Sequence, residues 1–316
     1  MRFDDGIGVS IYTHYKERKV KCYELTKQTP WVSAFFGTWA SPIRLRLPFL
    51  IHKETINMYN ENRSNIAIVT GASRSKGIGA AICRELAAKG VEVFFTHLCH
   101  YDKATGYEDA NGSWPEQFAQ ELREYGVRVE HMELDYFDAN AAVRLLDEVE
   151  NRLGRPTILI NNATHCVEVD HHHVTAQIID HHCIVNVRGT MMLSVEFAKR
   201  LEDAEEGGRI VNFVSGQDKE PQPGNLAYAA SKGAISAFTT SLAAELAPHR
   251  ITVNAIDPGP TDSGMEAFVQ DFLRPKFPTG RVGTPEDAAR LVSFLVSDEA
   301  KWITGQIIHS DGGFRN

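Results

Sequence analysis

Tyr228, Lys232 and Ser215 have the residue types and the spacing that could move a proton. Tyr228 and Lys232 are four residues apart, so on a helix both side chains lie on one face. An ammonium about 4 Å from a phenol, at an effective dielectric of about 20, lowers the phenol pKa by roughly three units from about 10. Ser215 follows the apolar run 210–214 and could orient a carbonyl or hydroxyl against that phenol. The pattern predicts a tyrosine that acts as a general acid.

The tyrosine-lysine spacing alone does not mark a site. Three other tyrosines, Tyr12, Tyr15 and Tyr23, also have a lysine four residues later. None of them follows an apolar run that ends in serine. The elements around Tyr228 therefore decide its role.

The composition excludes several classes of protein. The chain has 316 residues and a net charge of -8, whereas nucleic-acid binders usually carry a basic surplus. Five cysteines without a CxxC spacing indicate reduced thiols in a cytoplasmic protein. The longest uncharged run, residues 28–43, is shorter than the ~20 residues that span a bilayer. We expect neither a nucleic-acid partner nor a membrane span.

The first 57 residues differ in charge from the rest of the chain. They carry nine lysines and arginines against five acidic residues, a net of +4, which leaves -12 for the remainder. Asp4 and Asp5 stand where the basic start of a secretory signal belongs. We interpret residues 1–57 as an N-terminal extension that is poorly ordered or dispensable for chemistry, with a surface-binding arm as the alternative. Residues 58–316 then form one complete domain.

A glycine-rich loop separates the first strand of that domain from its first helix. The apolar strand 65–70 runs into Gly71, Gly77 and Gly79, and a helical pattern covers residues 80–89. This order places backbone N–H groups and a positive helix end where a pyrophosphate can bind. The loop therefore predicts dinucleotide binding.

Strand and helix patterns alternate along the rest of the domain. Further strands are expected at 91–96, 127–134, 157–160, 209–214, 251–256 and 306–309. Helices are expected at 114–125, 139–153, 175–201, 228–246 and 284–296, with Ser113 and Thr284 as N-caps. Apolar strands without alternation indicate a parallel sheet covered on both faces. The predicted fold class is α/β, a single Rossmann-type doubly wound parallel sheet with helices on both faces.

From residue 64 to residue 314, the motifs resemble the classical short-chain dehydrogenase/reductase family. The resemblance rests on Thr70 with the glycine loop, Asn161-Asn162-Ala163, Asn186, Ser215, Tyr228 with Lys232, and Pro258-Gly259 with Thr261. The stretches 280–287 and 304–313 are similar to bacterial 3-oxoacyl carrier-protein reductases. Two features depart from the family pattern: five residues separate Gly71 from Gly77 where the family has three, and Thr164 replaces a glycine.

By this resemblance, four residues carry the reaction. Tyr228 donates a proton to the carbonyl oxygen during reduction, and Lys232 lowers its pKa and holds the nicotinamide ribose. Ser215 hydrogen-bonds the substrate oxygen, and Asn186 helps to hold a water-linked proton path behind Lys232. Because the cofactor supplies the hydride, the protein only has to place donors where alkoxide charge develops.

The resemblance also assigns the cofactor site. Its expected residues are Gly71, Ser73, Arg74, Gly77, Ile78, Gly79, His97, Asp135, Asn162, Ala163, Tyr228, Lys232, Pro258, Gly259 and Thr261. An acidic residue about 20 positions past the glycine loop selects NAD, but that position is His97, and no carboxylate follows until Asp102. Arg74 and Lys76 could reach a 2′-phosphate. We therefore expect NADP(H) in preference to NAD(H).

Six of the thirteen histidines gather between residues 165 and 182. They are His165, His171, His172, His173, His181 and His182. Such a cluster could bind a metal, but adjacent histidines in an extended segment point in different directions. We expect no metal site here, and a solvent-facing or pocket-rim role instead.

The sequence thus predicts an NADPH-dependent reductase of a ketone or 3-oxoacyl group. Two alternatives stay open: a sugar or secondary-alcohol dehydrogenase working in the oxidative direction, and a non-catalytic dinucleotide-binding redox sensor. Aromatic side chains in the segment 262–279 indicate a lid over an apolar pocket for small-molecule carbonyl or alcohol substrates. The resemblance further implies a homo-oligomer, a tetramer or a dimer, with the helices that begin near Thr175 and Tyr228 as the contact surface.

Overall fold

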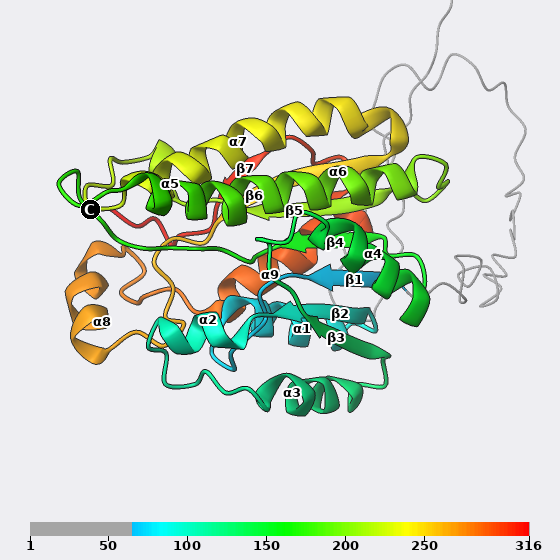
Figure 1. The fold of residues 1–316 in the computed structure, drawn as a ribbon, viewed down its shortest axis with the longest axis horizontal. Coiled ribbons are helices and arrows are strands. Elements are labelled where there is room, and N and C mark those ends of the chain that lie inside the picture. The colour runs from blue at the N-terminus through cyan, green and yellow to red at the C-terminus, as the bar shows by residue number, and fades with distance from the viewer. Residues whose placement is uncertain (1–64, 316) are drawn as a thin grey trace, which may run out of the picture. The chain divides into compact units, whose positions relative to one another are not determined.

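Seven parallel strands form one sheet at the centre of the domain (Figure 1). The structure is a computed structural model and describes residues 65–315. The strands are β1 Ile66–Val69, β2 Glu92–His97, β3 Val129–Glu133, β4 Ile158–Asn161, β5 Gly208–Phe213, β6 Ile251–Asp257 and β7 Ile307–His309. They are arranged in the order β3-β2-β1-β4-β5-β6-β7, and every neighbouring pair is parallel. The predicted α/β fold class is confirmed.

Helices connect the strands and cover both faces of the sheet (Figure 1). They are α1 Ile78–Ala87, α2 Cys99–Ala104, α3 Trp114–Arg123, α4 Ala141–Arg152, α5 Ala176–His182, α6 Thr190–Leu201, α7 Leu226–Leu246, α8 Ala267–Leu273 and α9 Pro285–Leu295. Because successive side chains of a strand point to opposite faces, each face has its own core. Phe95 packs in a cluster with Val292 of α9, whereas its neighbour Phe94 packs with Leu145 of α4 and Phe197 of α6. This two-sided burial explains the apolar runs of the central strands β1 and β4.

Two helices lie where the sequence indicated irregular segments. The helix α2 follows β2, and α8 lies within the expected lid segment. No residue of either helix is fully buried. The short helix α2 lacks the apolar periodicity that reveals a helix in a sequence. In contrast, α8, in the segment expected to form a lid and not a helix, has apolar residues at helical spacing, Phe268, Val269, Phe272 and Leu273. These two segments flank the carboxyl ends of the strands, where the candidate site lies (Figure 1).

The two expected helix caps differ in outcome. Thr284 and Asp287 form a reciprocal capping box at the start of α9, as predicted. Ser113 stands at the N-cap position of α3, but its side chain makes no capping bond. Its hydroxyl instead donates to the side-chain oxygen of Asn111 at 3.1 Å. The predicted cap at Ser113 is therefore wrong in its hydrogen bond, although the helix begins where expected.

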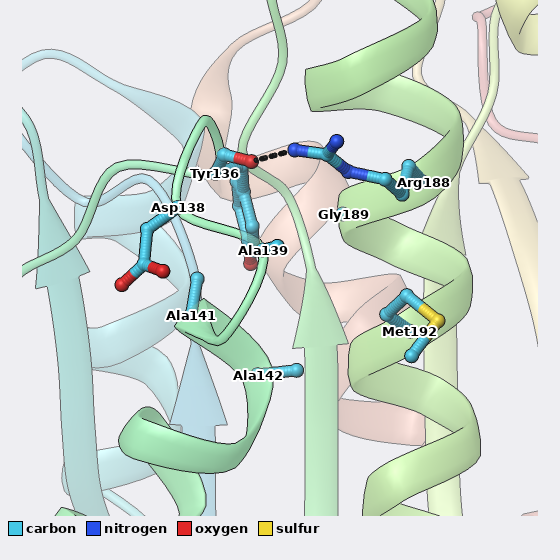
Figure 2. Close-up of a pocket in the computed structure, with 8 residues that line it drawn as sticks. All are labelled: Tyr136, Asp138, Ala139, Ala141, Ala142, Arg188, Gly189 and Met192. Carbon is cyan, nitrogen blue, oxygen red and sulfur yellow. Dashed lines mark hydrogen bonds between the residues drawn. The ribbon is translucent and has the colours of Figure 1, made fainter.

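The predicted helix 175–201 is helical throughout but changes its winding. A π-helical segment, Cys183–Gly189, separates α5 from α6. At its end, a Cβ atom on Gly189 would lie 2.8 Å from the ring of Tyr136, so only glycine fits there. Figure 2 shows Gly189 and Tyr136 on the wall of a pocket between α4 and this helix. Short π-helical segments are frequent at functional sites, and this one contains Asn186.

The proposed extension, residues 1–57, lies outside the described residues, and its boundary stays a prediction. Within residues 65–315, no helix is long and apolar enough to cross a membrane.

Candidate active site

The four predicted catalytic residues lie on three neighbouring elements. Ser215 follows the end of β5, Tyr228 lies in the first turn of α7, and Lys232 lies one turn later. Asn186 is buried in the π-helical segment beside α7. The fold therefore brings these side chains to one region at the carboxyl edge of the sheet, where ligands of doubly wound folds bind.

The Lys232 ammonium is buried and is held by the backbone. Its Nζ donates to the carbonyl oxygen of Phe213 at 2.9 Å and lies 5.5 Å from the centre of the Tyr228 ring. Burial lowers the pKa of Lys232 to about 8, because desolvation disfavours the charged amine. Lys232 therefore keeps most of its charge at pH 7 and loses it at mildly alkaline pH.

Burial also dominates the acidity of Tyr228. Desolvation raises the pKa of its phenol, and a hydrogen bond from Ser215 to the phenolate opposes that rise. This corrects the expectation that Lys232 lowers the Tyr228 pKa towards neutrality. The physical reason is that burial removes the water that would stabilise the phenolate, and this desolvation is the largest influence on the Tyr228 pKa. Tyr228 is consequently a protonated phenol at neutral pH.

Asn186 uses its whole amide to connect two segments of the site. Its Nδ2 donates to the His165 carbonyl and to the Ser231 hydroxyl, both at 2.9 Å. Its Oδ1 accepts from the His165 N–H at 2.7 Å and from the Thr164 hydroxyl at 3.2 Å. Thr164, the departure from the family motif, thus gains a partner that glycine would not provide. The structure shows Asn186 positioning the chain beside Lys232, and the water-linked relay stays a prediction.

The glycine loop is joined to the chain that follows β4. Gly71 has a φ of +72°, and a Cβ atom there would lie 2.7 Å from the Cα of Ala163. The Asn162 side chain donates to the carbonyl oxygens of Thr70 at 2.8 Å and Gly71 at 3.1 Å. A Cβ atom on Gly79 would come within 2.9 Å of that same amide. These close approaches explain the glycines at 71 and 79. The helix α1 begins at Ile78, directly after Gly77, so its N-terminus lies at the end of this loop.

Arg74 lies in a buried cluster and is not a free cation. Its guanidinium bonds Asp109 at 2.9 Å and the Ser263 carbonyl at 3.0 Å, and it pairs with Asp102 at 3.3 Å. It also stacks 3.4 Å above the centre of the Tyr107 ring. Arg74 therefore ties the glycine loop to the segment after β2 and to the segment after β6. The sequence could not show this, because both carboxylates lie in a stretch with no recognisable periodicity.

Two other residues of the glycine loop, Ser73 and Lys76, differ in whether their side chains are buried. The Ser73 hydroxyl accepts from the Leu98 N–H at 3.1 Å and is buried. The Lys76 N–H donates to Asp109 at 2.9 Å, while the Lys76 side chain is exposed. Lys76 directly precedes Gly77 and is the exposed basic residue of this loop.

His97 is the last residue of β2, and Asp135 lies two residues past the end of β3. Burial, and then the neighbouring His131, lowers the pKa of His97 to about 4, so the ring is neutral at pH 7. Its Nε2 lies 3.2 Å from the Nδ1 of His131. Asp135 accepts from the Phe137 N–H at 2.9 Å in a local turn. Their contacts with a cofactor stay predictions.

The segment after β6 is fixed by a polar network. A Cβ atom on Gly259 would lie 2.6 Å from Asp311, and the Thr261 hydroxyl donates to the Gly259 carbonyl at 3.1 Å. Pro258 precedes this turn, and Asp257 accepts from the Gly259 N–H at 3.0 Å. This network holds the backbone that the family places against the nicotinamide amide.

The same network contains the group best suited to hold a metal within residues 65–315. Asp257, His309 and Asp311 offer ligand atoms within 4.8 Å of one another. The ammonium of Lys219 already pairs with Asp311, and the imidazole of His309 bonds Asp257 at 2.9 Å. A protein cation and an imidazole therefore satisfy these carboxylates.

The histidine cluster contains packed and solvent-facing members. His182 is fully buried: its Nδ1 donates to the Ile178 carbonyl at 2.7 Å, and its Nε2 accepts from the Val167 N–H at 3.2 Å. The ring of His165 packs edge-on against it at 4.7 Å. Burial lowers the pKa of His165 to about 4. His182 is therefore a core residue, which corrects the expectation of a solvent-facing or pocket-rim role for this member of the cluster.

Two residues next to Ser215 were not anticipated from the sequence. Gln217 accepts the Ser215 N–H at 3.0 Å, and Gln222 donates to the Ser215 hydroxyl at 3.3 Å. Both lie in the loop between β5 and α7, which carries no repeating pattern. Proximity in sequence to Ser215 was the only available signal.

The comparisons with known proteins agree with this site. A family model described as enoyl-(acyl carrier protein) reductase matches residues 71–315. The oxidoreductase YjdA of Bacillus subtilis is 51% identical over 81% of this chain and 98% of its own length. The acetoacetyl-CoA reductase of Rhizobium meliloti is 34% identical over 79% of this chain and 98% of its own. The crystal structure of acetoin dehydrogenase YohF from Salmonella typhimurium matches with a TM-score of 0.68 and 31% identity, covering 80% of this chain and 97% of that one.

Fold, site and relatives together define an oxidoreductase that works with a nicotinamide dinucleotide. The chain belongs to the short-chain dehydrogenase/reductase family.

Proposed function

We propose that the protein is an NADPH-dependent reductase that converts a ketone or 3-oxoacyl group into a secondary alcohol. The observation that carries this proposal is that the fold brings Ser215, Tyr228 and Lys232 together in a chain similar to 3-oxoacyl and acetoacetyl-CoA reductases. A phenol that stays protonated at neutral pH is a proton donor, whereas alcohol oxidation needs a proton acceptor. The bound cofactor supplies the hydride. Tyr228 then gives its proton to the carbonyl oxygen, with Ser215 as the second donor and Lys232 as the nearby positive charge.

The preference for NADPH rests on Lys76 and His97. Lys76 offers an exposed ammonium at the glycine loop, and neutral His97 occupies the position where a carboxylate would repel a 2′-phosphate. Arg74, which was expected to assist, is already paired with Asp102 and Asp109. The proposed selectivity therefore depends on one cation and on the absence of a carboxylate at residue 97.

The substrate class is supported by the lid and by two relatives. Phe268 and Phe272 on α8 are 68% and 66% exposed, so this segment offers apolar surface beside the site. The 3-oxoacyl-[acyl-carrier-protein] reductase of Aquifex aeolicus is 31% identical over 79% of this chain, and the acetoacetyl-CoA reductase has been noted above. Both names describe reduction of a 3-oxoacyl thioester.

One observation favours the oxidative alternative. A related structure with 31% sequence identity is an acetoin dehydrogenase, so oxidation of a secondary alcohol is the second candidate function. A catalytically silent redox sensor is disfavoured, because Ser215, Tyr228 and Lys232 are all present and brought together.

The deciding assay follows NADPH and NADH consumption across a panel of ketones and 3-oxoacyl thioesters at pH 7. The proposal predicts turnover of at least one 3-oxoacyl thioester, with a higher kcat/KM for NADPH. Oxidation of sugars or secondary alcohols without any carbonyl reduction at pH 7 would overturn it.

The proposal includes a cytoplasmic homo-oligomer, a tetramer or a dimer. The outer face of α7 carries small exposed residues, Ala230, Ala234, Ala237 and Ser241, so a helix of a second copy could approach closely. Cys83, Cys99, Cys166 and Cys183 are free thiols, which fits a reducing compartment. Sedimentation at micromolar concentration tests the assembly, and a monomer would contradict it.

A chain beginning at Met58 should stay active if residues 1–57 are dispensable.

A further inference from the structure

The catalytic hydroxyl of Ser215 has a hydrogen-bond partner that the family assignment does not name. Gln222 lies six residues before Tyr228, in the loop between β5 and α7, and is partly buried. Its Nε2 donates to the Ser215 Oγ at 3.3 Å. The contact is made to the same oxygen that faces Tyr228, so it acts on a group of the catalytic site.

A second glutamine holds the backbone of the same serine. The Oε1 of Gln217 accepts the Ser215 N–H at 3.0 Å, and its Nε2 donates to the Ser236 hydroxyl on α7 at 3.0 Å. Ser215 is thus held twice: Gln217 fixes its backbone to α7, and Gln222 contacts its hydroxyl. The two glutamines offer a matched pair for separating backbone placement from control of the hydroxyl proton.

The donor at residue 222 determines which way the Ser215 proton points. A hydroxyl has one proton and two acceptor lone pairs, whereas an amide NH2 can only donate. The Gln222 amide therefore occupies a lone pair of Ser215 and leaves its proton free. That proton can then be donated towards the oxygen of Tyr228, whose pKa an interaction with Ser215 lowers. A carbonyl substrate, which has lone pairs and no proton, requires this polarity.

We propose that Gln222 is a positioning residue that keeps Ser215 as a hydrogen-bond donor towards the substrate oxygen. This inference rests on the proposed function, because a carbonyl oxygen that gains negative charge during reduction needs Ser215 as a hydrogen-bond donor. A hydrogen-bond acceptor at residue 222 would accept the hydrogen bond of the Ser215 hydroxyl. Of the two donors to the developing alkoxide, Ser215 and Tyr228, only Tyr228 would then remain.

The test compares Gln222→Glu with Gln217→Glu at pH 8, using the best carbonyl substrate of the wild-type enzyme. Both changes add one carboxylate beside Ser215 and keep the side-chain size. A carboxylate at residue 217 would still accept the Ser215 N–H, whereas a carboxylate at residue 222 would reverse the polarity of the hydroxyl. We expect kcat to fall at least tenfold in Gln222→Glu, with the cofactor KM within twofold of wild type, and a smaller fall in Gln217→Glu.

The pH profile supplies a readout that a purely structural role would not move. A protonated carboxyl can donate again, so the ratio of Gln222→Glu to wild-type kcat should rise as pH falls from 8 to 5, towards the ordinary glutamate pKa of about 4.3. Gln222→Met, which neither donates nor accepts strongly, should give an intermediate loss without this recovery. Thermal unfolding of each variant checks that the fold is kept.

Three outcomes would overturn the inference. The first is an unchanged or increased kcat in Gln222→Glu, which would mean that the amide oxygen of Gln222 faces Ser215. The second is an equal loss of kcat in both glutamate variants, which would indicate an effect of charge alone. The third is a loss of kcat in Gln222→Glu that does not recover at low pH. If the wild-type enzyme oxidises alcohols and reduces no carbonyl, the proposed function fails separately. The glutamate variants are then compared on that alcohol, because the forward and reverse reactions share one transition state.

Discussion

Lys232 donates its hydrogen bond to the backbone carbonyl of Phe213 at 2.9 Å, and not to the phenol of Tyr228. The last residue of β5 thereby fixes the ammonium one turn along α7 from the catalytic tyrosine. The amine has little solvent around it, with 4% of the residue exposed, and its pKa falls to about 8. This single contact links the fold to the pH range in which the site can work.

We predict that reductive kcat/KM falls as pH rises through about 8. Lys232 is charged below its pKa of about 8 and neutral above it, so the positive charge that stabilises the developing alkoxide is lost on the alkaline side. The raised pKa of Tyr228 adds no loss of its own below that point. Initial rates between pH 6 and 10 with saturating cofactor measure this. A profile that stays flat to pH 10 would contradict the assignment.

Lys232→Met should stabilise the protein at pH 7 while it removes activity. The charged amine is disfavoured in the folded state relative to its ordinary pKa of 10.5, which corresponds to about 3 kcal/mol. That cost is fully present below pH 8 and disappears as pH rises through 10.5. Losing the bond to the Phe213 carbonyl offsets about 1–2 kcal/mol, so we expect a net gain of about 1–2 kcal/mol.

Urea unfolding at pH 7 measures this gain, and the exposed Lys199→Met provides the control. The Lys199 side chain is 61% exposed, and its ammonium forms a long ion pair of 3.8 Å with Glu196. Replacing it should therefore change the free energy of unfolding by no more than about 0.5 kcal/mol. A Lys232→Met protein that is less stable than wild type would show that the ammonium is better compensated than its burial implies.

The cofactor proposal predicts opposite responses at two residues. Lys76→Met should lower kcat/KM for NADPH about tenfold and leave NADH nearly unchanged, because a charge-assisted bond to phosphate contributes roughly 1.5–3 kcal/mol. His97→Asp should narrow or reverse the preference by adding a carboxylate at the end of β2. Steady-state kinetics with both cofactors test the pair. A wild-type enzyme with the higher kcat/KM for NADH would refute the assignment.

Gly189→Ala should destabilise the domain by about 1–3 kcal/mol, because the new methyl group would enter the ring of Tyr136. Gly233→Ala is the matched control: no atom lies within 4 Å of its Cβ position in α7, so alanine should stabilise that helix by about 0.5–1 kcal/mol. Thermal unfolding distinguishes them. Equal effects would mean that the π-helical segment can move away from Tyr136.

The sequence predicted the sheet and the catalytic group because both depend on local patterns. A strand such as β1, which is buried along its whole length, appears as a continuous apolar run, and Tyr228 with Lys232 requires only a helix to bring the side chains together. The sequence did not predict the Arg74 cluster, since its carboxylates come from a segment with no periodic signal. It also indicated the wrong direction for the Tyr228 pKa, because the burial that raises this pKa depends on the assembled core.

The measurement that tests the central claim most directly is the turnover of Tyr228→Phe. Removing the phenol oxygen takes away the proton donor and little volume, so fold and cofactor affinity should stay near wild type while kcat falls by about two orders of magnitude or more. Tyr12, Tyr15 and Tyr23, which share the lysine spacing, serve as controls, and their phenylalanine variants should keep full activity. Near-normal kcat in Tyr228→Phe would contradict the account, because the proton would then come from another group.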